Sequence, residues 1–210
     1  MTQAAAAAFL MLVLLFGGPW VTVQSTGAPE PQPARTAQEQ TDAPGADESS
    51  VLRVWNGTET VEMTMAAYLP GVVRGEMPAT FEEEALKAQA VAERTYIYYH
   101  LQRGGKANHP DADVCMDHTC CNAWTGAEQA AQKWGEQAEA YEAKIQEAVR
   151  ATDGQVMLYN GQLILAAFHS SSGGVTASCR DVWVQDLPYL ASVASPESGE
   201  SVPNYYSVRE

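Results

Sequence analysis

Basic residues are scarce in this sequence of 210 residues. It holds 12 lysines and arginines against 26 aspartates and glutamates, so its formal net charge is −14. The summed field of such a chain repels the phosphate backbone of DNA or RNA. We therefore exclude nucleic acid as the partner, although a few clustered cations can still make one groove positive.

The N-terminal segment 1–23 lacks the basic start and the small-x-small cleavage site that are typical of a secretory signal peptide. It is mostly apolar from Ala4 to Val23, a run of 20 residues and about the length that a helix needs to cross a bilayer. An uncleaved membrane anchor, favoured by this length, and a cleaved signal both export the rest of the chain; a buried core helix is the third interpretation. We expect a membrane-anchored protein on the extracytoplasmic face.

Large apolar residues are almost absent from 24–50, which is rich in Pro, Ala, Thr, Gln, Asp and Ser. Such a stretch buries too little surface to fold, so it is predicted to be a disordered linker that holds the domain off the membrane. The globular domain is then expected over 51–210, as a single unit that begins near Val51.

Strand and helix patterns alternate in this domain, and no internal repeat is present. An Asn-Gly dipeptide, the signal of a type I′ hairpin turn, lies between β-rich runs at 51–63 and again at 155–168. Helices are predicted over 64–76, 80–103 and 135–152 from apolar spacing, acidic first turns and terminal glycines. The fold class is α+β, with mixed helices and short β-hairpins.

Three residues of the first two helices are candidates for chemistry. Lys87 and Arg94 lie two helical turns apart and share a face, either as surface cations or as the positive wall of a groove. Glu76 comes after an apolar run, where desolvation would favour the protonated form that a general acid needs, although a glutamate at a helix end is commonly solvated.

The sequence resembles the stage II sporulation protein D family over about 51–193. The resemblance is carried by YLPGVVRGEMP at 68–78, EALKAQAVAERTY at 84–96, ATDG at 151–154, FHSSSGG at 168–174, DVW at 181–183 and PYL at 188–190. It implies that Glu76 is the catalytic acid. It also implies that a glycan groove is lined by Lys87, Arg94, Tyr159, His169, Ser170 and Ser172.

This resemblance implies a lytic transglycosylase that cleaves the bonds between N-acetylmuramic acid and N-acetylglucosamine in peptidoglycan during sporulation and engulfment. One acid suffices, because it protonates the leaving oxygen and then takes the proton of the C6 hydroxyl, which closes a 1,6-anhydro ring. A hydrolase would need a second carboxylate, and no second acid motif accompanies Glu76. The expected partners are denuded glycan strands, an amidase and a membrane partner of the engulfment machinery. The alternative is a non-enzymatic, glycan-binding amidase enhancer.

Histidines and cysteines crowd into a loop at 109–121, where their side chains suit a tetrahedral zinc site. Disulfides are the alternative, with Cys115 bonded to one of the adjacent Cys120 and Cys121 and Cys179 bonded to the other. The family resemblance implies zinc ligands at His109, Cys115 and Cys121. Cys120 stands where the family usually has histidine, so either Cys120 or His118 completes the set.

Four protein ligands would close the site, so the predicted zinc is structural. A zinc peptidase is disfavoured because neither an H-E-x-x-H motif nor an open three-ligand site is present in the sequence.

Overall fold

The computed structural model describes residues 45–105, 108–109, 111–183 and 185–197. The predicted membrane segment 1–23 and most of the predicted linker, 24–44, lie outside these residues. Within the described part of the chain, no helix combines the length and the apolar character needed to cross a bilayer.

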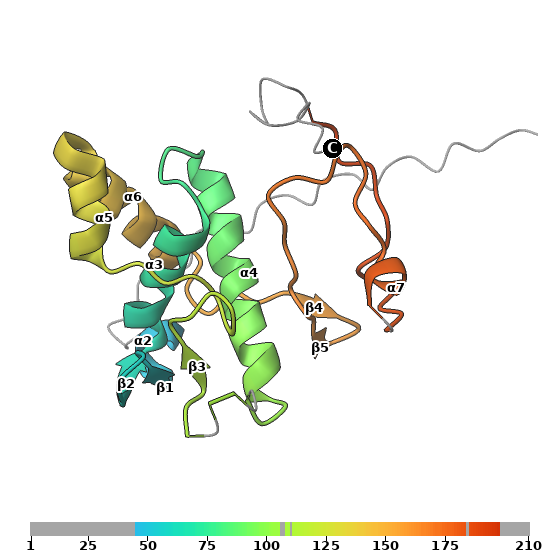
Figure 1. The fold of residues 1–210 in the computed structure, drawn as a ribbon, viewed down its shortest axis with the longest axis horizontal. Helices are drawn as coiled ribbons and strands as arrows, with labels where there is room; N and C mark the ends of the chain where they lie inside the picture. The colour runs from blue at the N-terminus through green and yellow to red at the C-terminus, as the bar shows by residue number, and fades with distance from the viewer. Residues whose placement is uncertain (1–44, 106–107, 110, 184, 198–210) are drawn as a thin grey trace, which may run out of the picture. The chain divides into compact units, whose positions relative to one another are not determined.

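The described domain combines helices with short strands, in agreement with the predicted α+β class (Figure 1). The helices are α2 (Ala46–Ser49), α3 (Met65–Glu76), α4 (Glu83–Leu101), α5 (Ala127–Trp134), the 3₁₀ turn η1 (Gly135–Gln137), α6 (Ala138–Ala151) and α7 (Cys179–Val182). The strands are β1 (Val51–Trp55), β2 (Thr60–Thr64), β3 (Val114–Cys115), β4 (Leu158–Tyr159) and β5 (Gln162–Leu163).

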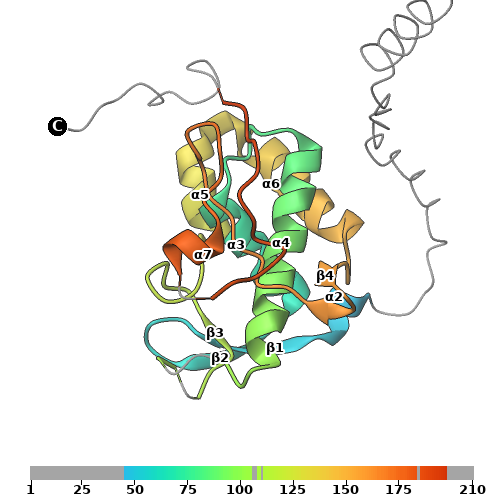
Figure 2. The same ribbon diagram turned by 90° about the vertical axis from the view of Figure 1, so that its right-hand side faces the viewer.

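The core lies where α3, α4 and α6 pack against one another. Each contributes fully buried aliphatic side chains, among them Leu69 and Val72 of α3, Leu86 of α4 and Ile145 of α6. The β1–β2 ribbon lies near one end of α3 and α4, and α5 and α6 cover the other end (Figures 1 and 2). This packing positions the C-terminal end of α3, which carries Glu76.

The first sheet has the order β2-β1-β3, with β1 antiparallel to β2 and parallel to β3. The predicted Asn56-Gly57 turn is wrong: Trp55 pairs with Thr60, and the Asn56 N–H donates to the Glu59 carbonyl at 3.1 Å, so Gly57 and Thr58 lie at the turn. Asn56 lacks the positive φ of a type I′ turn, and its Oδ1 accepts hydrogen bonds from the N–H groups of Thr58 and Glu59. This local Asx turn replaces the expected geometry.

The second hairpin has the predicted turn. Asn160 and Gly161 adopt φ angles of 50° and 75° between β4 and β5, as a type I′ turn requires. Its strands are shorter than predicted, with two residue pairs in register.

Helix boundaries agree with the sequence expectations at the centre of each helix and differ at the ends. The predicted helix 80–103 is observed as Glu83–Leu101, and 135–152 as a 3₁₀ turn that leads into Ala138–Ala151. Helix α5 was not predicted; Gly135, with φ of 55°, separates it from the next helix.

The folded unit begins before Val51, which corrects the predicted linker boundary. Helix α2 lies within 24–50, and its Asp47 is buried. The Asp153 carboxylate accepts hydrogen bonds from the N–H groups of Ala46 and Asp47, both at 2.8 Å. The composition suggested a linker throughout, but Gly45–Ser50 is held by these polar contacts rather than by apolar burial.

Candidate functional site

Glu76 is the last residue of α3, and the polypeptide leaves the helix at Met77 and Pro78. Its Oε1 accepts a hydrogen bond of 2.6 Å from the N–H of Ala123. The side chain is partly exposed, so this carboxyl is both oriented by the protein and accessible from solvent.

A short stretch of chain, the 122–125 segment, is fastened along α3 and supplies the amide that orients Glu76. The Thr125 N–H donates to the Gly71 carbonyl at 2.9 Å, and the Trp124 indole donates to the Tyr68 carbonyl at 3.2 Å. Arg74 donates to the Thr125 carbonyl at 2.9 Å. Two glycines of α3 leave room for this close approach, because they present no side chain to the segment.

Gly75 is required by close packing. A Cβ atom at this position would lie 2.4 Å from the carbonyl oxygen of Ala123, well inside van der Waals contact. The Gly-Glu pair of the motif therefore has a physical basis: the glycine admits the 122–125 segment, and the glutamate accepts its amide.

Glu93 is a second carboxyl at this site, and its role was not predicted from the sequence. It lies on α4, is fully buried and accepts a hydrogen bond of 2.7 Å from Gln89 and another from Asn122. Burial, together with the nearby charge of Glu76, raises the pKa of Glu93 to about 8. The sequence does contain an indication that Glu93 is buried, because helical spacing places it on the same face as the apolar Ala90 and Ile97.

The structure separates the two cations that were predicted to line one groove. Lys87 is partly exposed, and its ammonium pairs with Glu83 at 2.7 Å and Glu84 at 2.8 Å. These two carboxylates raise the pKa of Lys87.

Arg94 corrects the prediction, because its side chain is completely buried. Its guanidinium pairs with Asp47 at 2.6 Å and donates to the carbonyls of Gln155 and Val149. The spacing from Lys87 placed both on one helical face, but the docking of α2 covers Arg94. This residue ties α2 to α4 and does not line an open groove.

His109, Cys115, Cys120 and Cys121 form a cluster in which one possible ligand atom of each lies within 4.8 Å of the others. Four ligands around a tetrahedral metal are about 3.8 Å apart for bonds of about 2.3 Å, so the spacing fits such an ion. His109 Nδ1 lies 3.0 Å from the Ala112 carbonyl. A carbonyl at this distance favours the tautomer with the proton on Nδ1, which leaves the Nε2 lone pair free to bind a metal. Nε2 lies 3.2 Å from the Cys121 sulfur.

His118, the alternative fourth ligand, and Cys179, the possible disulfide partner, lie outside the cluster. The His118 side chain is 78% exposed and faces Asp117, so Cys120 and not His118 stands in the fourth position. Cys179 is buried near Leu187, whose N–H lies 3.1 Å from its sulfur. All four cysteines are free thiols in the structure, which does not contain the alternative disulfides.

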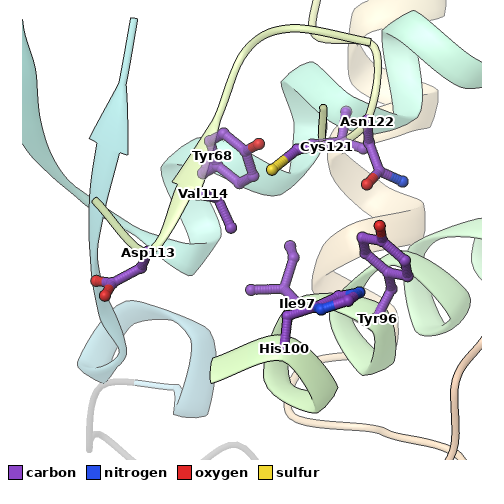
Figure 3. A pocket seen from close by; sticks show the side chains of 9 residues that line it. Tyr68, Tyr96, Ile97, His100, Asp113, Val114, Cys121 and Asn122 are labelled. Atoms are coloured by element: carbon purple, nitrogen blue, oxygen red, sulfur yellow. The ribbon is translucent and has the colours of Figure 1, made fainter. Parts of the chain in front are cut away.

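A small internal cavity separates the cysteine cluster from α4 (Figure 3). Cys121 and Asn122 border it on one side, and Tyr96 and His100 of α4 border it on the other. The Tyr68 hydroxyl donates to the Cys115 carbonyl at 2.8 Å, and burial raises the pKa of this tyrosine. The cluster is thus attached to α3 directly before the 122–125 segment begins.

Predicted substrate-binding residues of the C-terminal part of the domain gather around a cleft of about 600 Å³. His169 and Ser172 line it, and Tyr159 contacts its wall through Tyr189, with ring centroids 5.4 Å apart. Ser170 is exposed beside these residues and is not part of the lining. Within the described ranges, no hydrogen bond links this cleft to Glu76.

The serine and glycine loop at one edge of the cleft binds a carboxylate of the chain itself. Ser171 and Ser172 donate through their hydroxyls to Glu197, and the N–H groups of Ser172 and Gly173 do so as well. These hydrogen bonds, led by that of the Ser172 amide, lower the pKa of Glu197 to about 2.

Comparison with known proteins identifies the family. Residues 56–159 match the family model described as stage II sporulation protein. The chain is 37% identical over 142 residues to stage II sporulation protein D of Bacillus subtilis (strain 168), covering 68% of this chain and 41% of that protein. It is equally similar to the protein of the same name from Bacillus amyloliquefaciens, with 37% identity over 143 residues and the same shares.

A relative with a different name is the amidase enhancer of Bacillus subtilis (strain 168), 38% identical over 122 residues, which cover 58% of this chain and 14% of that protein. The chain spans about two fifths of the length of the sporulation proteins that it matches. The resemblance noted in the sequence is confirmed, and this chain belongs to the stage II sporulation protein D family.

Proposed function

We propose that this domain cleaves peptidoglycan glycan strands as a lytic transglycosylase, with Glu76 as the catalytic acid. The observation that carries the proposal is the difference between two neighbouring carboxyls. Glu76 is oriented by the Ala123 amide and partly exposed, whereas Glu93 is fully buried. Only Glu76 of this pair is accessible to a substrate, which supports a mechanism with a single catalytic carboxyl.

In the proposed reaction, Glu76 donates its proton to the glycosidic oxygen as the bond from that oxygen to C1 of N-acetylmuramic acid breaks. The resulting carboxylate then takes the proton of the C6 hydroxyl of the same sugar, while the C6 oxygen forms a bond to C1. The products are a free hydroxyl on the leaving sugar and a 1,6-anhydro ring, and no water is consumed. Lys87, Tyr159, His169, Ser170 and Ser172 are proposed to bind the glycan; Arg94 is left out because it is buried.

We assign a structural zinc ion to the cluster of His109, Cys115, Cys120 and Cys121. The donor set and its spacing support this ion, which when bound would hold the loop that leads into the 122–125 segment. The proposed setting is the extracytoplasmic face of a membrane during sporulation and engulfment, on denuded strands and beside an amidase.

The alternative function is amidase enhancement without cleavage, which the similarity to an amidase enhancer favours. Retention of an oriented carboxyl at Glu76 supports the enzyme instead, since a protein that only grips glycan needs no oriented acid.

Mass spectrometry of denuded glycan after incubation with the protein tests both functions. The parent should release fragments with 1,6-anhydro ends, and Glu76→Gln should lower their rate of release by at least about 10²-fold with the fold intact, because a general acid contributes on that scale. Glu62→Gln, an exposed glutamate on β2, is the matched control. Products without the anhydro ring would indicate hydrolysis. No cleavage of denuded glycan, together with stimulation of an amidase on peptidoglycan that still carries its stem peptides, would establish the alternative.

A further inference from the structure

The two carboxyls of the site are connected through two consecutive residues of the 122–125 segment. Asn122 binds Glu93 with its side chain, and Ala123, the next residue, binds Glu76 with its backbone N–H. A displacement of Asn122 therefore moves the amide that orients Glu76. Asn122 is itself buried, as is Gln89, which contacts the other oxygen of Glu93.

We propose that Glu93 is a positioning residue for Glu76: buried in the core and hydrogen-bonded to Asn122, it fixes Asn122 and thereby the Ala123 amide that binds the catalytic carboxyl. The inference rests on the proposed function of Glu76. Glu93 does not touch substrate, because it is fully buried.

Burial favours the neutral form of Glu93. The amides of Gln89 and Asn122 donate hydrogen bonds to its two oxygens and by themselves lower its pKa, but burial outweighs them and neither amide brings a positive charge. The neighbouring cation on α4, Arg94, is turned away and paired with Asp47. A charged carboxyl here would lack a counterion in the core, which is costly unless the group keeps its proton.

The titratable groups that interact with Glu93 are Glu76 and Tyr68, both on α3. Glu76 adds to the rise in the pKa of Glu93, and Tyr68, beside the cysteines, is held neutral by burial. Neither supplies a positive charge. With a pKa of about 8, Glu93 keeps its proton at neutral pH.

The raised pKa has a consequence for stability that is independent of activity. The folded state holds this proton more tightly than the unfolded chain does, so the contribution is fully present below the ordinary glutamate pKa. It is lost as the pH rises through the folded pKa of about 8. The Tm of the parent should therefore fall between pH 5 and pH 8.5, and Glu93→Gln, which cannot ionise, should show a smaller fall.

The test compares Glu93→Gln with Glu93→Leu on denuded glycan at pH 7. Glutamine keeps the shape and the hydrogen-bonding capacity of the neutral acid, so kcat should stay within about twofold of the parent. Leucine fills the space without holding Asn122. We expect kcat to fall about tenfold or more with KM little changed, since small displacements of a catalytic group are costly. Both variants should keep the metal content. Glu93→Gln should keep the Tm of the parent at pH 5, whereas Glu93→Leu leaves the buried amides of Gln89 and Asn122 without their acceptor and should melt at a lower temperature.

Parent-like kcat in Glu93→Leu would overturn the inference, and so would a loss in Glu93→Gln as large as that in Glu93→Leu, because the charge would then be required. If Glu93→Leu does not fold, Glu93→Gln tests the inference alone: a parent-like kcat and a smaller fall of Tm with pH support it, and a large loss of kcat overturns it. Glu62→Gln controls for the removal of an acid elsewhere. Parent-like activity of Glu76→Gln would defeat the proposed function itself, whereas an inactive Glu76→Gln beside an unaffected Glu93→Leu would defeat this inference alone.

Discussion

Adjacent residues of α4 place an acidic and a basic side chain in the core, and their surroundings differ. Arg94 is neutralised by Asp47 and by backbone carbonyls, so it serves the fold. Glu93 meets only amides and lies near Glu76, so it belongs to the site. Of two adjacent residues on α4, Arg94 therefore forms a structural ion pair, whereas Glu93 is proposed to position the candidate catalytic carboxyl.

Gly75→Ala tests the packing that brings Ala123 to Glu76. Alanine normally stabilises a helix interior by about 1 kcal/mol relative to glycine. Here the new Cβ would lie 2.4 Å from the Ala123 carbonyl oxygen, so the 122–125 segment must shift. We expect lower stability in urea unfolding and a loss of glycan cleavage of about tenfold or more.

Gly126→Ala is the control for that substitution, since its Cβ would have an ordinary contact distance of 3.5 Å to Trp124. It should change both quantities little. A Gly75→Ala protein that is more stable than the parent and fully active would contradict the role assigned to close packing.

The connection between α3 and the loop 109–121, which carries the histidine and cysteine cluster, is the main feature at the scale of elements. Tyr68 binds the Cys115 carbonyl, and Trp124 returns a hydrogen bond to the Tyr68 carbonyl. The cysteines therefore anchor a piece of chain that has little regular structure of its own, directly before the amide that contacts Glu76. Metal binding at this loop would act on the site through its position and not through reaction chemistry.

Cys115→Ser tests the structural metal. The purified domain should contain about one equivalent of zinc, and the variant should lose zinc and melt at a lower temperature, because the free energy of metal binding is also free energy of folding. His118→Ala, which changes an exposed side chain outside the cluster, and Glu76→Gln should both keep the metal. Elemental analysis without zinc, joined by mass spectrometry showing two disulfides, would refute the metal site and leave Glu76 untouched.

At the scale of the whole domain, α2 closes the fold at its N-terminal side. Asp153 binds the first amides of this helix, and Asp47 pairs with Arg94 beneath it. Residues that look like linker by composition therefore cover α4. These polar contacts connect α2 to α4 and to the residues that follow α6.

Asp47→Ala tests the buried ion pair between Asp47 and Arg94. Removing one partner of a buried pair leaves the Arg94 charge uncompensated, and such losses cost about 3 to 5 kcal/mol. The free energy of unfolding in urea should fall on that scale, whereas Arg150→Ala, which breaks the exposed pair with Glu147, should cost no more than about 1 kcal/mol. Equal, small effects of the two substitutions would show that Asp47 and Arg94 contribute little to the fold.

Local chemistry was sufficient to predict several features of this protein. The Asn160-Gly161 turn, the helix centres and the α+β class arise from propensity and spacing over short stretches. The motif around Glu76 identified the family, and the crowding of thiols and imidazole predicted the cluster that the structure assembles. In each case the residues that decide the outcome lie close together in the sequence.

Contacts between distant segments decided the rest. Arg94 is buried because α2, 47 residues earlier at Asp47, docks on it, and no spacing on α4 reveals this. Glu93 becomes part of the site because Asn122 reaches it from another loop. Short stretches of sequence specify which groups are present, the helix centres and the Asn160-Gly161 turn. Burial, and with it the protonation of Glu93 and the pairing of Arg94, exists only once the elements have packed, because it depends on contacts between distant segments.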